Sequence, residues 1–504
     1  MKMPTQKFEI RRTGNFWIDL GTVALWNYFA TQLQEVNRRE DYEEMDAENF
    51  KAKLARDSFV VEGEESTVNE RLQDAVDFLE ERVWGETRRG RMWWKGCAQF
   101  FFQQQKNPND FLSSPQEMVK SKKWRAGICD FCGHKGEMVK SVGTSEIPFI
   151  VVRNKFMTFY PNLKRDMNIC VACTFASRFA LLGIFFNITG DVLNASIMEG
   201  EDLLNLSKSL YYFGGQLLAK RLVEDYRNYK SMIYHTQHTL ESFLDFLLFS
   251  WSKFGEEFVD EEEQELSEAW RGKLFHVFQA RKDGKVVTFE HYYIIPDVER
   301  VFQVFNIMKW QDRDGKEHNA LQHVLNNFYF ERRVGKRKEI DTILREDLCR
   351  RILYGNEIFD AVENFLYKSA LVEEKFLEPF VVLNFKIFVE KYEEEVIGLE
   401  EVVLRDCESV GSVLGSLAAS TEDKGVLYTL RSIRSLDDFL ESLHQILVRY
   451  ADELDIYRER VKGILREINE KNWKRYRALI GIYAVLEYMK KKREEEKGKE
   501  KEKQ

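Results

Sequence analysis

Proline is scarce in this chain, with 7 residues among 504. Because proline interrupts helix interiors, its scarcity allows long helical segments. Long apolar runs are missing too. The most apolar stretch, residues 179–186, is far shorter than the roughly 20 residues that span a bilayer. The polar segment 1–12 lacks the apolar core of a signal peptide. We therefore expect a cytoplasmic protein with no membrane contact.

Signatures of common enzymes are also absent. The sequence contains no HExxH, no GxSxG, no GxxxxGK[ST] and no His-Asp dipeptide. These absences disfavour zinc peptidases, α/β-hydrolases, P-loop nucleotidases and metal-dependent phosphohydrolases. The sequence therefore indicates a protein that is not itself an enzyme.

Basic charge is in deficit overall, with a formal net charge of −9. This argues against a simple basic nucleic-acid binder but leaves room for local basic surfaces. Hydrophobic residues make up 44% and charged residues 32% of the chain, which is a globular composition. A length of 504 residues predicts several domains rather than one.

Composition divides the chain into four regions and a tail. We predict a helix-rich α+β protein of several domains, with a zinc knuckle inserted after an N-terminal mixed domain and a helical bundle at the C-terminus. The predicted parts are a mixed α/β domain (1–120), a cysteine region (121–176), a helical domain (177–380), a helical bundle (381–493) and a charged tail (494–504).

Local patterns predict several elements within these regions. Strands are expected at 58–61, 149–152 and 156–160, and a hairpin at 273–295 turns at Asp283-Gly284. Ser435 is expected to cap a helix with an apolar stripe. A last helix is expected from about 460 to 489, followed by residues that fray. His235 and His238 are expected on one helix face.

The most informative pattern consists of two CxxC pairs, Cys129-Cys132 and Cys170-Cys173, which are 37 residues apart. Each pair can turn two thiolates toward one centre, and zinc prefers four such ligands in a tetrahedron. Four thiolates leave no open position, so the site would be structural. His134 could replace a thiolate but is more simply a surface residue. The remaining cysteines, Cys97, Cys349 and Cys407, are interpreted as small buried side chains.

Two basic segments are candidates for nucleic-acid contact, although each could be a solvated loop. The first interleaves cations with two tryptophans, a pattern suited to holding phosphates and stacking bases. The second is a glycine-containing basic loop. The candidate residues are Arg88, Arg89, Arg91, Lys95, Arg332, Arg333, Lys336, Arg337 and Lys338. The basic helix from Lys462 to Arg493 could follow a displaced DNA strand or form a solvated face.

The opening motif TGNFWIDLG (13–21), expected to be a loop opening a helix near Asp19, comes before the two CxxC pairs. A helical segment, GVLYTLRSIRSLDDFLESLHQIL (425–447), follows them. In this order, they resemble the CXXC–CXXC family of CRISPR-associated large subunits. The resemblance implies a subunit of a type I surveillance complex that recognises a motif beside the target and helps to open the duplex. Its partners would be the other effector subunits, guide RNA, target DNA and a separate helicase–nuclease.

Two other classes stay open on the sequence alone. One is a zinc-associated nuclease, which the closed sulfur site and the missing acidic triad disfavour. The other is a scaffold protein without direct nucleic-acid contact.

Overall fold

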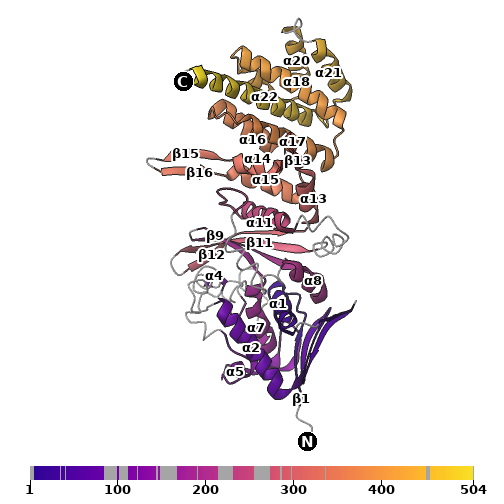
Figure 1. Cartoon of the computed structure of the whole chain (residues 1–504), viewed down its shortest axis with the longest axis vertical. Helices are drawn as coiled ribbons and strands as arrows, with labels where there is room; N and C mark the ends of the chain where they lie inside the picture. The colour runs from indigo at the N-terminus through magenta and orange to yellow at the C-terminus, as the bar shows by residue number, and fades with distance from the viewer. Residues whose placement is uncertain are drawn as a thin grey trace. The chain divides into compact units, whose positions relative to one another are not determined.

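The structure is a computed structural model that carries side chains (Figure 1). It describes residues 5–33, 36–39, 41–83, 99–101, 112–121, 123–143, 146–147, 167–189, 191–213, 231–254, 273–283, 286–296, 298–334, 337–449 and 455–502. The chain forms two compact units, the first from residues 1–230 and 254–299 and the second from residues 231–253 and 300–504. The helix-rich α+β class is confirmed, whereas the finer division into four regions stays a prediction.

The first unit begins with an antiparallel sheet whose strand order is β1-β5-β4-β3-β2. Its strands are β1 (Thr5–Arg11), β2 (Asn37–Arg38), β3 (Tyr42–Ala47), β4 (Phe50–Ala55) and β5 (Ser58–Glu64). In β4, buried Phe50, Ala52 and Leu54 alternate with partly exposed residues, as expected for a sheet with one covered face. The strand predicted at 58–61 is the first part of β5.

Helix α1 (Phe16–Leu33) forms the centre of this unit, while α2 (Glu65–Val83) follows β5. Residues Trp17 to Phe29 of α1 are all buried, so the helix packs on every side. Asn15 caps it, because its side chain accepts hydrogen bonds from the backbone of Trp17 and Ile18. The helix predicted to open near Asp19 therefore begins three residues earlier.

A second antiparallel sheet, of order β12-β11-β10-β9, also lies in the first unit. It comprises β9 (Phe185–Thr189), β10 (Val192–Glu199), β11 (Leu274–Asp283) and β12 (Val286–Ile295), with α8 (Leu203–Phe213) after β10. Strands β11 and β12 pair over the residues for which the sequence predicts a hairpin, and Asp283 lies opposite Val286. Gly284, and the strands predicted at 149–152 and 156–160, lie outside the described residues.

The second unit is mostly helical. Its helices are α11 (Thr239–Phe254), α13 (Glu299–Ile307), α14 (Ala320–Asn327), α15 (Ile343–Tyr354), α16 (Phe359–Tyr367), the π-helical turn η5 (Lys368–Val372), α17 (Pro379–Glu395), α18 (Glu401–Ser420), α19 (Gly425–Ser432), α20 (Leu436–Arg449), α21 (Asp455–Glu467) and α22 (Trp473–Glu502). Two small hairpins, β13 (Lys309–Gln311) with β14 (Glu317–Asn319) and β15 (Phe330–Val334) with β16 (Arg337–Asp341), complete it. Ser435 caps α20 as predicted, accepting a hydrogen bond from Asp438 N at 3.1 Å.

Helix α22 packs along α18 at very short range. A β-carbon on Gly415 would lie 2.1 Å from the carbonyl oxygen of Ala484, and one on Gly411 would lie 2.6 Å from Cβ of Tyr483. Both positions need glycine because the two helix backbones touch there. Helix α16 also contacts α22: the nearly buried pair Glu363 and Arg477 is 2.8 Å apart. The contacts of α22 therefore extend to residues before 381.

Two predictions for the C-terminal end are wrong. The single helix expected from 460 to 489 is divided into α21 and α22. The residues expected to fray continue α22 to Glu502, because Arg493 and Lys497 both pair with Glu378, at 2.7 and 2.5 Å.

The prediction that His235 and His238 share a helix face is also wrong, because both residues precede α11. No helix in the described part of the chain is long and apolar enough to cross a membrane.

Candidate metal centre

The first cysteine pair lies at the turn of a short hairpin in the first unit. Strands β6 (Arg125–Ile128) and β7 (Lys135–Ser141) pair antiparallel, and Cys129 and Cys132 follow β6 in the connection. The amide of Gly133 donates to the carbonyl of Cys129 at 3.0 Å, and Gly133 has a φ of 73°. Glycine is favoured there because other residues rarely adopt a positive φ.

The second pair reaches the same place through β8 (Asn168–Cys170) and helix α7 (Val171–Phe179). Strand β8 pairs with β7, which puts Cys170 opposite Val139, and Cys173 follows in the first turn of α7. Asp130 ties the two halves together: its backbone amide donates to the carbonyl of Asn168, and its carboxylate accepts from the amide of Asn168 at 2.7 Å. Asp130 was not predicted as a site residue. Its only signal in the sequence is its position between the two cysteines of the first CxxC pair.

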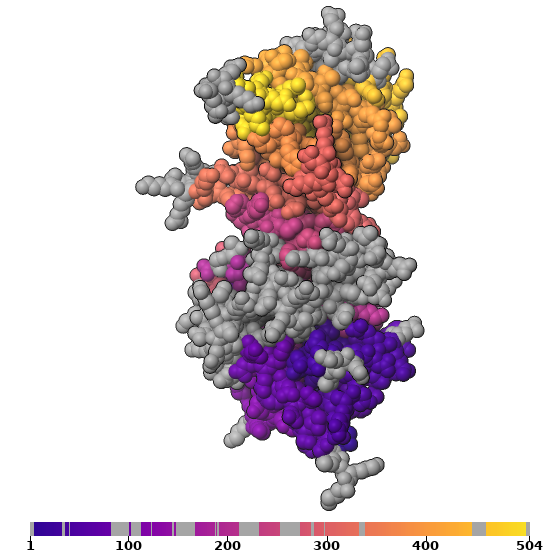
Figure 2. Space-filling view, viewed as in Figure 1, coloured from indigo at the N-terminus to yellow at the C-terminus, as the bar shows by residue number. Residues whose placement is uncertain are grey.

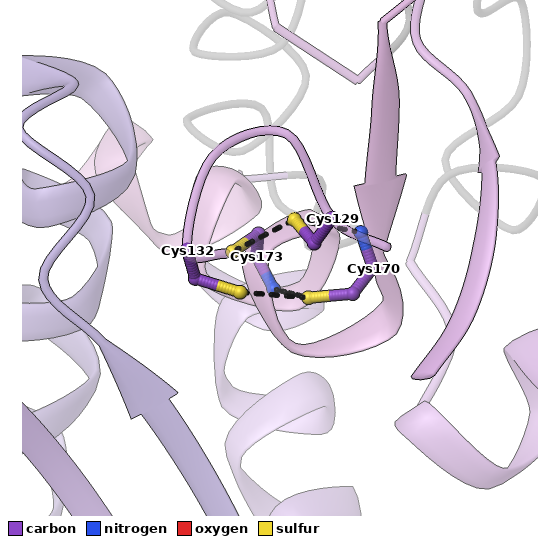
Figure 3. A group of neighbouring side chains, drawn as sticks. All are labelled: Cys129, Cys132, Cys170 and Cys173. Carbon is purple, nitrogen blue, oxygen red and sulfur yellow. Dashed lines mark hydrogen bonds between the residues drawn. The ribbon is translucent and has the colours of Figure 1, made fainter. Parts of the chain in front are cut away.

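Figure 3 shows the four cysteine side chains turned toward one another. The sulfur atoms of Cys129 and Cys173 are 3.9 Å apart, those of Cys132 and Cys170 are 3.8 Å apart, and all four lie within 4.8 Å of one another. A tetrahedral ion with metal–sulfur bonds of about 2.3 Å would separate its ligands by about 3.8 Å. The four cysteines can therefore hold one metal ion without rearrangement of the backbone.

The surroundings favour thiolates at this position. The amide of Cys170 donates to the sulfur of Cys129 at 3.3 Å, and the amide of Cys173 donates to that of Cys170 at 3.4 Å. Cys170 is the N-cap of α7, where the helix dipole favours negative charge. Arg11 of β1 interacts electrostatically with Cys132. These contacts offset part of the negative charge that a divalent ion with four thiolates would carry.

The four thiols do not titrate independently. Hydrogen bonds from Cys132, then from Cys170 and Cys173, lower the pKa of Cys129. The contact with Cys129 instead raises the pKa of Cys170 and of Cys173. An ion that binds all four sulfurs must displace the protons that the thiols hold. Metal affinity should therefore weaken as the pH falls.

The opening motif packs against this centre through α7. Gly21 of α1 faces Ala176 of α7, and the rings of Phe8 and Phe175 are 5.8 Å apart. Asp19 accepts hydrogen bonds from the backbone of Thr13 and Gly14, which fixes the start of α1. Two of the three motifs that carry the family resemblance, the opening motif and the cysteine pairs, are therefore neighbours in space.

The other predicted site residues lie elsewhere. His134 does not belong to the cluster; its carbonyl accepts a hydrogen bond from the amide of Cys129. Cys349 and Cys407 are buried, as predicted, whereas Cys97 lies outside the described residues. Across the described ranges, the four cysteines are the one group of three or more His, Cys, Asp or Glu side chains that could share a metal.

The structure describes only part of the two basic segments that were predicted to contact nucleic acid. Arg88, Arg89, Arg91 and Lys95 fall outside the described residues, as does Lys336. The segment around Arg332 is not a loop but the hairpin β15–β16, in which Arg333 lies opposite Lys338. Its strands extend away from the helices of the second unit (Figures 1 and 2). In the basic helix, Arg475, Arg477 and Arg493 are engaged in ion pairs with Glu357, Glu363 and Glu378.

One known protein family matches the region that contains the four cysteines. Residues 122–185 match the model of a family described as CRISPR-associated protein (Cas_CXXC_CXXC), and all four cysteines lie in the matched segment. Over these residues the chain is similar to the CRISPR-associated CXXC–CXXC family. The resemblance based on the cysteine pairs is thereby confirmed for the segment that contains them. No curated protein matches the chain.

Proposed function

We propose that this chain is the large subunit of a type I CRISPR RNA-guided surveillance complex. The observation that carries the proposal is the cluster of four cysteines inside the segment that matches the CRISPR-associated family. In this role the chain contributes to recognition of the motif beside the target, to target DNA binding and to recruitment of a separate helicase–nuclease. It is a cytoplasmic subunit that performs no cleavage itself.

Zinc is the metal that we propose for the cluster. Four thiolates form a soft, closed ligand set with no position for water or substrate, which suits a structural zinc ion. The ion would fix β6, β7, β8 and α7 to one another and so support the packing of α1. This purpose needs no acid, base or nucleophile beside the metal.

Co-purification tests the assignment. The affinity-tagged chain would be expressed with the CRISPR gene products encoded beside it and a guide-RNA array. The expected result is one assembly that contains the chain, the other effector subunits and guide RNA. A chain that elutes alone and free of RNA, although the other subunits assemble with their guide, would overturn the proposal.

Two further measurements distinguish the competing classes. Incubation of the purified chain with labelled DNA and magnesium or manganese should leave the DNA intact; cleavage that Cys129→Ser abolishes would indicate a nuclease. A complex that contains the chain should bind target DNA more tightly than one without it, and this gain should decrease with salt. If the chain adds no affinity for target DNA at any salt concentration, the remaining class is a scaffold protein without direct nucleic-acid contact.

A further inference from the structure

Residues 231–238, which precede α11 in the second unit, have a backbone that is fixed by hydrogen bonds to side chains from elsewhere in that unit. The buried guanidinium of Arg345 donates to the carbonyls of Tyr234 and His235, both at 2.9 Å, and Asn326 accepts from the amide of Tyr234 at 2.8 Å. Arg345 is itself fixed by buried Glu241, at 3.2 Å. His235 has a φ of 60°. A non-glycine residue keeps such a backbone only where its surroundings impose it.

This rigid backbone presents aromatic rings at the surface. Tyr234 is 62% exposed. The exposed ring of His235 lies 5.8 Å from the ring of Tyr329, at an interplanar angle of 65°. Rings that are already ordered lose little conformational entropy when a flat ligand stacks on them.

Two lysines lie near these rings, one in the β15–β16 hairpin and the other in the segment after η5. Lys375 Nζ lies 4.5 Å from the centre of the Tyr329 ring. Lys338 is exposed and pairs with Glu331 at 2.6 Å. Glu331 lies two residues after Tyr329, whose ring contacts both Lys375 and His235. Lys338, through that hydrogen bond, then Lys375 and His235 lower the pKa of Glu331.

We propose that this surface binds an unpaired DNA strand, with bases stacked on Tyr234, His235 and Tyr329 and phosphates held by Lys338 and Lys375. Ordered rings beside amines match the two needs of a single strand, namely exposed base faces and a negative backbone. Paired bases would not offer these faces. In a guide-directed complex, the strand displaced from the target is the DNA that is left unpaired. The inference rests on the proposed function in naming that strand.

Fluorescence anisotropy with labelled oligothymidine tests the surface on the full chain and on the assembled complex. Tyr234→Ala combined with His235→Asn removes two rings, and asparagine tolerates a positive φ. Oligothymidine affinity should fall about 5- to 100-fold, while binding of a duplex of equal length stays unchanged. Tyr234→Phe should keep wild-type affinity. Tyr428→Ala, at a tyrosine 47% exposed in the same unit, is the matched control and should have no effect.

The amines have a separate measurement. Lys338→Gln with Lys375→Gln should reduce the slope of log affinity against log salt by roughly 0.7 for each phosphate of a single strand that is no longer neutralised. Arg313→Gln with Lys316→Gln, at two exposed cations between β13 and β14 in the same unit, should leave the slope unchanged.

Three results would overturn the inference. The first is unchanged oligothymidine affinity of the ring variant in both the chain and the complex. The second is loss of a protein subunit from the variant complex with DNA binding intact, which would identify a protein contact. The third is a loss confined to oligouridine, which would identify guide RNA. Guide-RNA co-purification is scored independently, so failure of the proposed function is distinguishable from failure of this surface.

Discussion

Gly21 of α1 lies so close to Ala176 of α7 that a β-carbon on Gly21 would come within 1.9 Å of the Ala176 carbonyl oxygen. The neighbouring atoms are all backbone, so no side chain can rotate away. The helix that follows the opening motif therefore touches the helix that carries Cys173.

Replacement of this glycine should separate the two helices. We expect Gly21→Ala to lower the free energy of unfolding by about 3 kcal/mol, near the upper end of overpacking costs, and to reduce the metal content. Urea denaturation and elemental analysis check both effects. Gly498→Ala, where a β-carbon would meet nothing within 4 Å, should be neutral or stabilising. A Gly21→Ala protein as stable as wild type would contradict the close packing.

The cysteine cluster should hold one zinc ion per chain. Cys129→Ser and Cys173→Ser should each lose the metal and lower the unfolding temperature, because a structural zinc ion contributes directly to folding. Cys407→Ala removes a buried cysteine outside the cluster and should keep one zinc per chain. Zinc release should increase on acidification, as protons compete for the sulfurs. Freshly purified protein without zinc would refute the assignment.

Stability of the second unit should decrease as the pH rises. Burial raises the pKa of Asp245 to about 8, although its carboxylate accepts hydrogen bonds from Ile233 N and Ser231 Oγ. An unfolded aspartate titrates near pH 4. The folded state therefore binds this proton more tightly, and the associated stability, complete below about pH 4, is lost as the pH rises toward 8.

Unfolding by urea between pH 5 and pH 7.5 measures this effect. Asp245→Asn keeps an acceptor but removes the titration, so the pH slope of the unfolding free energy should flatten by up to about 1.4 kcal/mol per pH unit. Asp437→Asn, at an exposed aspartate in α20, should preserve the wild-type slope. Equal slopes in wild type and Asp245→Asn would show that the carboxyl is already ionised at low pH.

Charge reversal tests the two basic segments within the complex. Glutamate in place of Arg88, Arg89, Arg91 and Lys95, or of Arg332, Arg333, Lys336, Arg337 and Lys338, should weaken target binding. It should also flatten the salt slope by about one unit for each phosphate that is deprived of its cation. Guide-RNA assembly should be unaffected. Reversal of Arg313 and Lys316, two exposed cations between β13 and β14, is the control. Unchanged target affinity with both segments reversed would remove them from the DNA-binding surface.

The cysteine cluster was predictable because its signal is local and its chemistry is restrictive. The two CxxC pairs contain all four ligands. Their spacing alone therefore predicted the common centre of Cys129, Cys132, Cys170 and Cys173. Ser435 was predictable for a similar reason, because a cap depends on residues within one helical turn.

The predictions failed where a residue far away in the sequence determines the local structure. Residues 494–502 carry only charge and glycine, yet they stay helical because Glu378, more than a hundred residues earlier, pairs with Arg493 and Lys497. The hairpin β15–β16 was mistaken for a loop because a run of cations hides the alternation of a strand. His235 leaves helical geometry because buried Arg345, far along the chain, fixes its carbonyl.

Helix α11 and residues 231–238 before it belong to the second unit, although the chain up to residue 230 and from 254 to 299 belongs to the first. Its Glu241 is the buried partner of Arg345. A gene divided anywhere between codons 254 and 300 would put these two residues on different polypeptides, and the downstream product would carry a guanidinium without its carboxylate.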